Sequence, residues 1–233
     1  MQRFWEKIIG PIFEREQPHI IVEIGALRGE HTVKLLYYCQ HRNATLIVVD
    51  PFPAFHEKQW GEELGQNMIL LREYSLDVLP RLAWMDAVLI DGDHNWYSVY
   101  HELKEVEKFA QKPGGRFPLV FLHDTEWPYG RRDLYHNPDL IPAQFRQPYA
   151  KKGIIQGRSE LADQGGFNSG SYHAIHENGP RNGVLTAIED FMRESSFSLT
   201  LHRVSSNNGL AVLVPANQER DLFIEQVIKQ SGM

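Results

Sequence analysis

Apolar and polar positions divide this chain into alternating blocks, in which a short and nearly unbroken apolar run is followed by apolar residues spaced three or four apart. Unbroken runs are typical of strands covered on both faces, whereas the wider spacing marks one face of a helix. Five such runs lie at residues 20–23, 45–50, 68–73, 86–91 and 118–124. The alternation predicts a parallel sheet with helices packed on it.

Helices are expected wherever the apolar spacing follows the helical period. The expected ranges are 32–39, 99–110, 184–191 and 222–228, with shorter polar helices at 56–66 and 75–82, the last with Ser75 as its cap. Residues 3–16 have the same spacing, but Pro11 predicts a break in that helix. Two final runs, 197–204 and 209–215, flank residues 205–208 and predict a hairpin, which a purely parallel sheet would lack.

Residues 125–182 differ from the rest of the chain, because they are rich in Pro, Gly, Asn, Arg and aromatic residues and show little periodicity. A segment this long without regular structure is usually functional in a compact domain. We therefore expect residues 1–233 to form one doubly wound α/β domain. Its seven-stranded sheet is expected to be mostly parallel with one antiparallel strand, and residues 125–182 are expected to form a substrate lid.

Composition limits the partners of the protein. The chain has 233 residues and a formal net charge of −6, which argues against a nucleic acid and favours a small molecule or a saccharide. The single cysteine, Cys39, has no internal disulfide partner, and the first residues lack the apolar core of a signal peptide. No apolar run approaches the ~20 residues of a membrane-spanning helix. The expected location is the cytoplasm, without a membrane partner.

Acidic residues mark the ends of four predicted strands. They are Glu23, Asp50, Asp91 and Asp124. Right-handed crossovers between parallel strands place all four at one edge of the sheet. Carboxylates gathered there are unfavourable without a cation or a hydrogen-bonding ligand nearby. The glycine turn after the first strand, bracketed by Gly25 and Gly29, lies at the same edge, where ligands bind in such sheets.

This pattern resembles the class I S-adenosylmethionine-dependent methyltransferases over essentially the whole chain. The motif after the first strand reads Glu23-x-Gly25-x-x-x-Gly29, Asp50 follows the second strand, and the hairpin stands where that fold carries its reversed strand. The motifs after the fourth and fifth strands read Asp91-Gly92-Asp93-His94 and His123-Asp124-Thr125. These two motifs resemble the metal-dependent sugar O-methyltransferases of the macrocin and mycinamicin type, and also the cephalosporin-hydroxylase-like branch.

The resemblance implies that S-adenosylmethionine binds at the glycine turn. Its glycines admit the methionine part, Glu23 is placed to hold the ammonium, and Asp50 is placed to accept the ribose hydroxyls. The implied cofactor-binding residues are Glu23, Gly25, Ala26, Gly29, Thr32, Asp50, Ser75 and Asp91. A plain tight turn is the alternative for the glycines. A nicotinamide enzyme fits less well, because its fingerprint G-x-G-x-x-G needs one more glycine.

The resemblance also implies a divalent cation held by Asp91, His123 and Asp124. Oxygen-rich ligation favours Mg²⁺, whereas a histidine ligand shifts the preference toward Mn²⁺. The relatives usually carry a carboxylate where this chain has His123, so a core histidine is the alternative for that residue. His94 stands at the position of the general base, and a helix-capping histidine is the alternative. The implied catalytic residues are His94 and Asp91, the latter through the cation.

The expected lid begins with residues suited to an acceptor. Aromatic Trp127 and Tyr129 suit a sugar ring, while Arg131 and Arg132 suit a phosphate or carboxylate. A nucleotide-sugar or an acidic glycan is therefore an expected acceptor. Packing of the segment, or a homo-oligomer interface, is the alternative for these side chains. Two other functions remain open: a noncatalytic cofactor- or glycan-binding subunit, and an iron-dependent oxygenase that uses His94, His123 and one carboxylate.

Overall fold

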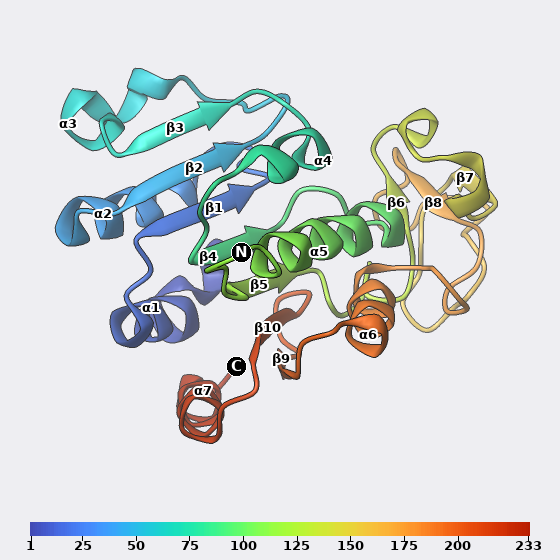
Figure 1. Ribbon diagram of the computed structural model, residues 1–233. Helices are drawn as coiled ribbons and strands as arrows, with labels where there is room; N and C mark the ends of the chain where they lie inside the picture. The colour runs from blue at the N-terminus through green and yellow to red at the C-terminus, as the bar shows by residue number, and fades with distance from the viewer.

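The computed structural model describes residues 1–233 and contains a seven-stranded sheet with the strand order β3-β2-β1-β4-β5-β10-β9 (Figure 1). Its strands are β1 (Ile20–Ile24), β2 (Thr45–Val49), β3 (Met68–Leu71), β4 (Ala87–Ile90), β5 (Leu119–His123), β9 (Leu199–Val204) and β10 (Leu210–Pro215). The first five strands pair in parallel, and β10 runs antiparallel to both β5 and β9. The predicted sheet, including one reversed strand next to its edge, is confirmed.

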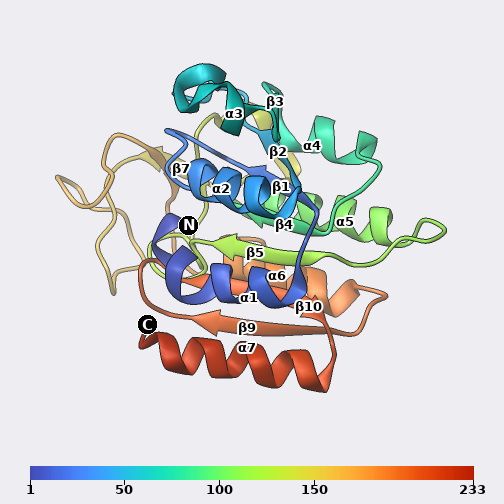
Figure 2. The ribbon, with the colours of Figure 1, turned by 90° about the vertical axis from the view of Figure 1, so that its left-hand side faces the viewer.

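Helices cover both faces of this sheet (Figure 2). They are α1 (Gly10–Glu16), α2 (Thr32–Arg42), α3 (Gly61–Gly65), α4 (Ser75–Val78), α5 (Trp96–Ala110), α6 (Val184–Glu194) and α7 (Gln218–Ser231). One apolar core lies between the sheet and α1, α2 and α7, and a second lies between the sheet and α4, α5 and α6. The near-continuous apolar strands follow from this burial on both sides.

The N-terminal segment is helical without the predicted interruption. A 3₁₀ turn (Gln2–Phe4) and a π-helical turn (Trp5–Ile9) lead directly into α1. Pro11 lies at the start of α1, where a missing backbone N–H needs no partner within the helix. The expected break is therefore replaced by a change of helix type, and the whole segment packs on the sheet.

Residues 125–182 contain more regular structure than their sequence predicts. A second, three-stranded antiparallel sheet has the order β6-β8-β7, formed by β6 (Leu134–Tyr135), β7 (Tyr149–Lys151) and β8 (Tyr172–Ala174). Strands of two or three residues are too short to show a periodicity of two, so the pattern could not reveal them. This small sheet lies beside α5 and α6, away from the β3 edge of the main sheet (Figure 1).

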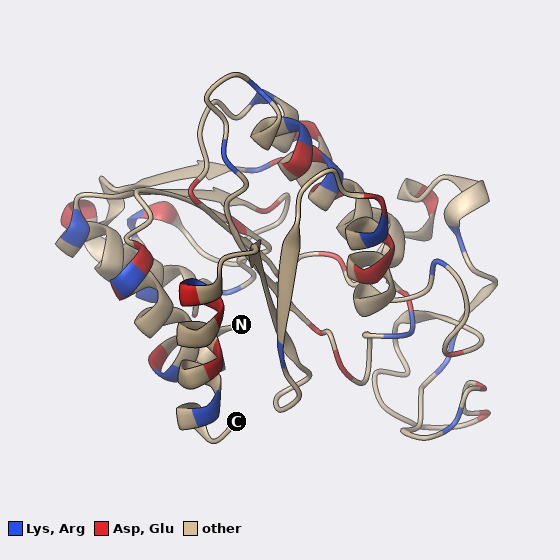
Figure 3. Cartoon of the chain, turned by 60° about the horizontal axis from the view of Figure 1, so that its bottom comes forward, with Lys and Arg blue, Asp and Glu red and all other residues tan.

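Charged residues of both signs alternate along the helices (Figure 3). None of the helices combines the length and the apolar character that crossing a bilayer requires. The expected cytoplasmic location and the oligomeric state stay predictions.

Candidate active site

A cavity of about 300 Å³ opens at the carboxyl edge of the main sheet, between the glycine turn and the ends of β4 and β5. Seven of the predicted site residues line it: Glu23, Gly25, Ala26, Asp91, His94, His123 and Asp124. The structure therefore brings together in one cavity the glycine turn and both motifs that follow β4 and β5, although up to 100 residues separate them in the sequence.

The two glycines of the turn have different roles. Gly25 has φ +82°, and an added Cβ would lie 2.4 Å from the carbonyl oxygen of Asp91. Only glycine lets the turn after β1 approach the end of β4 this closely. Gly29 also has a positive φ, but its Cβ position meets the ring of Trp60 at 2.5 Å, and Gly29 does not line the cavity. In this structure, therefore, the missing side chain of Gly29 makes room for the Trp60 ring.

Glu23 is buried and already has partners. Its carboxylate accepts a hydrogen bond from the Thr32 hydroxyl at 2.6 Å and lies 3.0 Å from Nδ1 of His31. These contacts join β1 to the beginning of α2. Thr32 is fully buried and turned toward Glu23, so its hydroxyl stabilises the turn in this state of the protein.

Asp50 also holds the turn. Its Oδ2 accepts hydrogen bonds from the backbone N–H groups of Ala26 and Leu27, both at 2.9 Å, and its Oδ1 accepts one from Phe52 at 2.8 Å. A carboxylate offers about four acceptor positions. Three of them are used, so this conformation leaves Asp50 one position for a ribose hydroxyl rather than the two that the sequence resemblance implies.

Ser75 is not the cap of its helix. Tyr74 is the N-cap residue of α4, and the Ser75 hydroxyl instead donates to Oε1 of Glu102, on α5, at 2.5 Å. Ser75 lies outside the lining of the cavity. The cap prediction is wrong because Tyr74 has the extended backbone of an N-cap residue, so Ser75 is already the first residue of the helix.

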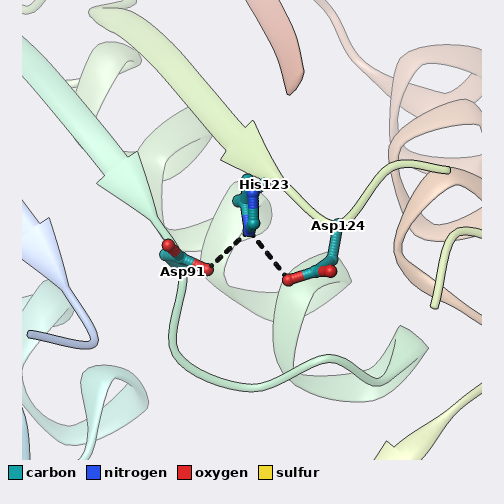
Figure 4. A group of neighbouring side chains, drawn as sticks. All are labelled: Asp91, His123 and Asp124. Atoms are coloured by element: carbon teal, nitrogen blue, oxygen red, sulfur yellow. Dashed lines mark hydrogen bonds and ion pairs between the residues drawn. The ribbon is translucent and has the colours of Figure 1, made fainter. Parts of the chain in front are cut away.

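Two aspartates and two histidines form a compact cluster in the cavity, three members of which are drawn in Figure 4. Nδ1 of His123 lies 3.1 Å from Oδ1 of Asp91 and 2.8 Å from Oδ2 of Asp124. Nε2 of His94 lies 2.8 Å from the same Asp124 oxygen and 3.6 Å from Asp91 Oδ1. His123 therefore points into the cavity with the two carboxylates, and its alternative placement in the core is wrong.

The backbone of Asp124 has φ +57°, a left-handed conformation that is uncommon for a residue with a side chain. Asp124 is only 4% exposed, and its Oδ1 has no hydrogen-bond partner. The second oxygen of Asp91 accepts a hydrogen bond from the Met1 ammonium group at 2.8 Å. Strained backbone and an unpartnered buried carboxylate oxygen are features of functional sites rather than of optimised cores.

The charges of the cluster stabilise one another. Burial alone would lower the pKa of His94, but the Asp124 and Asp91 carboxylates raise it to about 10. The same competition raises the pKa of His123 to about 9. Burial opposes ionisation of the two aspartates, yet the adjacent histidines hold the pKa of both well below the usual range. Without another cation, the cluster therefore contains two carboxylates and two protonated imidazoles at neutral pH.

The donor set also suits a divalent cation. One ligand atom from each of Asp91, His123 and Asp124 lies within 4.8 Å of the other two. Carboxylate oxygen and imidazole nitrogen are ordinary ligands of such ions, and the unpartnered Oδ1 of Asp124 leaves acceptor capacity unused. The residues present therefore fit the cation that the sequence resemblance implies.

The four predicted acceptor-binding residues do not behave alike. The Tyr129 ring lies 5.3 Å from the His94 ring, and Trp127 packs against Phe167 at 5.3 Å. Arg131 instead forms a bidentate ion pair with Glu189 on α6. The guanidinium of Arg132 is fully buried and donates to backbone carbonyls within residues 125–182. None of the four residues lines the cavity, and the two arginines are engaged in holding the segment together.

The structure adds residues that the sequence did not single out. His31, Arg28 and Glu30 line the cavity from the turn before α2, and Asn208 lines it from the β9–β10 hairpin. His136, in the segment after β5, has its ring 5.9 Å from that of His94. His31 directly precedes the predicted helix and was open to sequence reasoning, whereas nothing local marks Asn208 or His136.

A family model of known proteins matches the part of the chain that forms most of the cavity. Residues 22–125 match a protein-family model described as a methyltransferase domain, a range that covers the glycine turn, Asp50 and the whole cluster. The match shows a methyltransferase domain over residues 22–125, and the strand order with its reversed β10 is the one predicted from the resemblance to the class I fold. No curated protein matches the chain by sequence.

Solved structures with similar folds include several methyltransferases. SAH-bound PaMTH1 from Podospora anserina is 11% identical, with 89% of this chain and 77% of that chain covered at a TM-score of 0.48. A putative O-methyltransferase from Klebsiella pneumoniae is 14% identical (88% and 77% covered, TM-score 0.46). A putative caffeoyl-CoA O-methyltransferase from Staphylococcus aureus is 10% identical (89% and 81% covered, TM-score 0.43). Similarity at this level carries no information about the substrate or mechanism of the present protein.

Proposed function

We propose that the protein is an S-adenosylmethionine-dependent O-methyltransferase that uses a divalent cation, Mg²⁺ or Mn²⁺, to methylate a sugar hydroxyl of a saccharide or glycosylated small molecule. One observation carries the proposal: the cluster of Asp91, His123 and Asp124 lines the same cavity as the Gly25 turn. In this fold the glycine turn serves the cofactor, so a cation-binding group beside it lies where an acceptor oxygen meets the methyl group.

The cofactor is proposed to lie across the turn at Gly25 and Ala26, with its ribose toward Asp50. The reaction is a displacement in which the acceptor oxygen bonds to the methyl carbon while the carbon–sulfur bond breaks. S-adenosylhomocysteine leaves, and the hydroxyl proton passes to a side chain of the cluster. The protein mainly supplies positioning, which is worth roughly 7–11 kcal/mol in well-oriented reactions. A bound cation would acidify the acceptor hydroxyl.

A neutral acceptor is favoured over an acidic one. Arg131 and Arg132, whose spacing in the sequence suits a phosphate or carboxylate, are both occupied by internal partners. Aromatic Trp127 and Tyr129 stand at the start of residues 125–182, and the Tyr129 ring adjoins His94. The Tyr129 ring is buried between the rings of His94 and His173, whereas Trp127 is partly exposed. An aromatic face is a common way to hold a sugar ring, so residues 125–182 are proposed as the acceptor lid with Trp127 as the sugar contact.

The first test is calorimetric titration of S-adenosylmethionine and S-adenosylhomocysteine into the protein, with NAD as the comparison ligand. Both sulfur nucleosides should bind and NAD should not. Methyl transfer from labelled cofactor is then measured on a panel of neutral and acidic glycosides with Mg²⁺ or Mn²⁺. Absence of binding by either sulfur nucleoside would refute the proposed function.

The role of the cluster is tested with Asp124→Asn. This variant should lose at least ~100-fold in turnover while its affinity for S-adenosylhomocysteine changes little, because Asp124 is proposed to act on the acceptor side. Asp139→Asn, at a residue within 125–182 whose side chain is 90% exposed, is the matched control and should behave as the unsubstituted protein. Equal turnover in Asp124→Asn and the control would remove the cluster from the reaction.

Two other outcomes would redirect the proposal. Cofactor binding without transfer to any acceptor, with or without metals, would favour a noncatalytic binding subunit. Bound iron together with oxygen-dependent product formation would favour an oxygenase, for which the cluster does supply two histidines and a carboxylate.

A further inference from the structure

The four side chains of the cluster form a closed quadrilateral of alternating nitrogen and oxygen atoms. Its corners are His94 Nε2, Asp124 Oδ2, His123 Nδ1 and Asp91 Oδ1, and its edges are 2.8, 2.8, 3.1 and 3.6 Å. Two ligand atoms that are each ~2.1 Å from a cation lie ~3.0 Å apart at a right angle and ~3.4 Å apart at a tetrahedral angle. The edges span these values, so the four atoms are close enough to surround one cation, and His94 is placed no farther from a common centre than the other three.

His94 is close to its carboxylate neighbour without being hydrogen-bonded to it. Nε2 lies 2.8 Å from Asp124 Oδ2, yet neither ring nitrogen of His94 has a partner with the alignment that a hydrogen bond requires. Asp124 is more than nine-tenths buried, and its Oδ1 is also unpartnered. His123 Nδ1 is instead hydrogen-bonded to both carboxylates. The His94 ring nitrogens and Asp124 Oδ1 therefore keep lone-pair capacity that a shared cation could use.

The surrounding structure restrains the backbone of His94 and packs one aromatic ring against its imidazole. The His94 backbone carbonyl accepts a hydrogen bond from Leu134 at 3.0 Å, and the next residue, Asn95, caps α5 through its side chain. The Tyr129 ring lies against the imidazole. A side chain held in this way is preorganised to bind at one point rather than to follow a moving proton.

We propose that His94 is the fourth ligand of the cation, which makes the site a two-histidine, two-aspartate centre for a transition-metal ion such as Mn²⁺ or Zn²⁺ rather than for Mg²⁺. This inference rests on the proposed function of the same cavity. Imidazole nitrogen favours transition metals, whereas Mg²⁺ prefers oxygen ligands and keeps several waters. Two imidazoles out of four protein ligands therefore shift the selectivity further than His123 alone.

Metal affinity tests the inference without any assay of turnover. Mn²⁺, Zn²⁺ and Mg²⁺ are titrated calorimetrically into the unsubstituted protein, His94→Gln and His136→Gln. Loss of a group that merely orients a ligand costs roughly 10–100-fold in metal affinity, so loss of a ligand should cost at least ~10-fold. His136→Gln removes a nearby imidazole that lies outside the quadrilateral, and it should leave Mn²⁺ affinity unchanged.

Pulsed electron paramagnetic resonance of bound Mn²⁺ gives an independent readout. The unsubstituted protein should show nitrogen couplings from two imidazoles, and His94→Gln should show one. Circular dichroism of the variant establishes that it is folded. Unchanged Mn²⁺ affinity and an unchanged nitrogen signal in His94→Gln would overturn the inference, as would tighter binding of Mg²⁺ than of Mn²⁺.

These outcomes are separable from failure of the proposed function. If S-adenosylhomocysteine binds and methyl transfer occurs while His94→Gln keeps its metal affinity, the function stands and His94 returns to the role of a base. If neither sulfur nucleoside binds while the metal results hold, the centre stands and the methyltransferase proposal falls.

Discussion

A buried carboxyl group away from the cavity predicts an unusual dependence of stability on pH. Glu102, on α5, is 1% exposed, and only its Oε1 has a partner, the hydroxyl of Ser75. Burial raises the pKa of Glu102 from 4.5 to about 8, against the opposing hydrogen bond from Ser75 and with support from the charge of Asp93. The folded protein therefore keeps Glu102 protonated at neutral pH.

The sign of the effect is opposite to that of a salt-bridged carboxylate. Below pH 4.5 Glu102 is protonated in the folded and unfolded chains alike, and it makes no pH-dependent contribution. Above that value the unfolded chain loses the proton and the folded chain retains it, so the free energy of unfolding falls until about pH 8. At ~1.4 kcal/mol per pH unit, the loss between about pH 5 and about pH 7 amounts to about 2–3 kcal/mol.

Glu102→Gln removes this titration and keeps the shape of the side chain and a group that can pair with Ser75. Urea unfolding is measured at several pH values between about 5 and 8 for the unsubstituted protein and the variant. The stability of the variant relative to the unsubstituted protein should rise by about 2–3 kcal/mol over the first two pH units. Glu105→Gln, which affects a carboxylate of the same helix paired with Lys108, is the control and should show no such rise. Parallel curves for Glu102→Gln and the unsubstituted protein would refute the reasoning.

Two further comparisons test the turn and the segment after β5. Gly25→Ala should lose about 2–5 kcal/mol of stability from positive-φ strain together with overlap with the Asp91 carbonyl. Gly61→Ala, with φ +83° and ψ 163° but nothing within 4 Å, should lose only the strain, about 1–3 kcal/mol, and equal losses in urea unfolding would contradict the clash. Arg132→Met should cost about 2–5 kcal/mol because it leaves buried carbonyls unpaired, whereas Arg131→Met, at a partly exposed ion pair, should cost at most about 1 kcal/mol. Similar denaturation midpoints for the two arginine variants would argue against the burial of Arg132 as the cause.

Much of the fold is readable from local pattern. The apolar runs predict β1 to β5, and the hairpin around residues 205–208 predicts the reversed strand, because burial on both faces and turn chemistry leave their marks within a few neighbouring residues. The same logic places Asp91 and Asp124 at one edge, since parallel strands end together. His123 lies with Asp91 and Asp124 because the side chain of this last residue of β5 faces the cavity and not the core. The sequence left both directions open.

Other features depend on contacts between distant parts of the chain. Asp50 accepts three hydrogen bonds from backbone N–H groups, two of which lie about 24 residues away in the sequence. The Arg132 guanidinium donates to the backbone carbonyl of Ala174, 42 residues away. Nothing in the sequence near Asp50 or Arg132 shows that the side chain has an internal partner and is not free to bind a ligand. The amino-acid sequence by itself determines which polar groups arrive at the edge of the sheet. Only the tertiary structure decides which of them remain free for a ligand, because each buried polar group takes whichever partner the packed chain brings within hydrogen-bond distance.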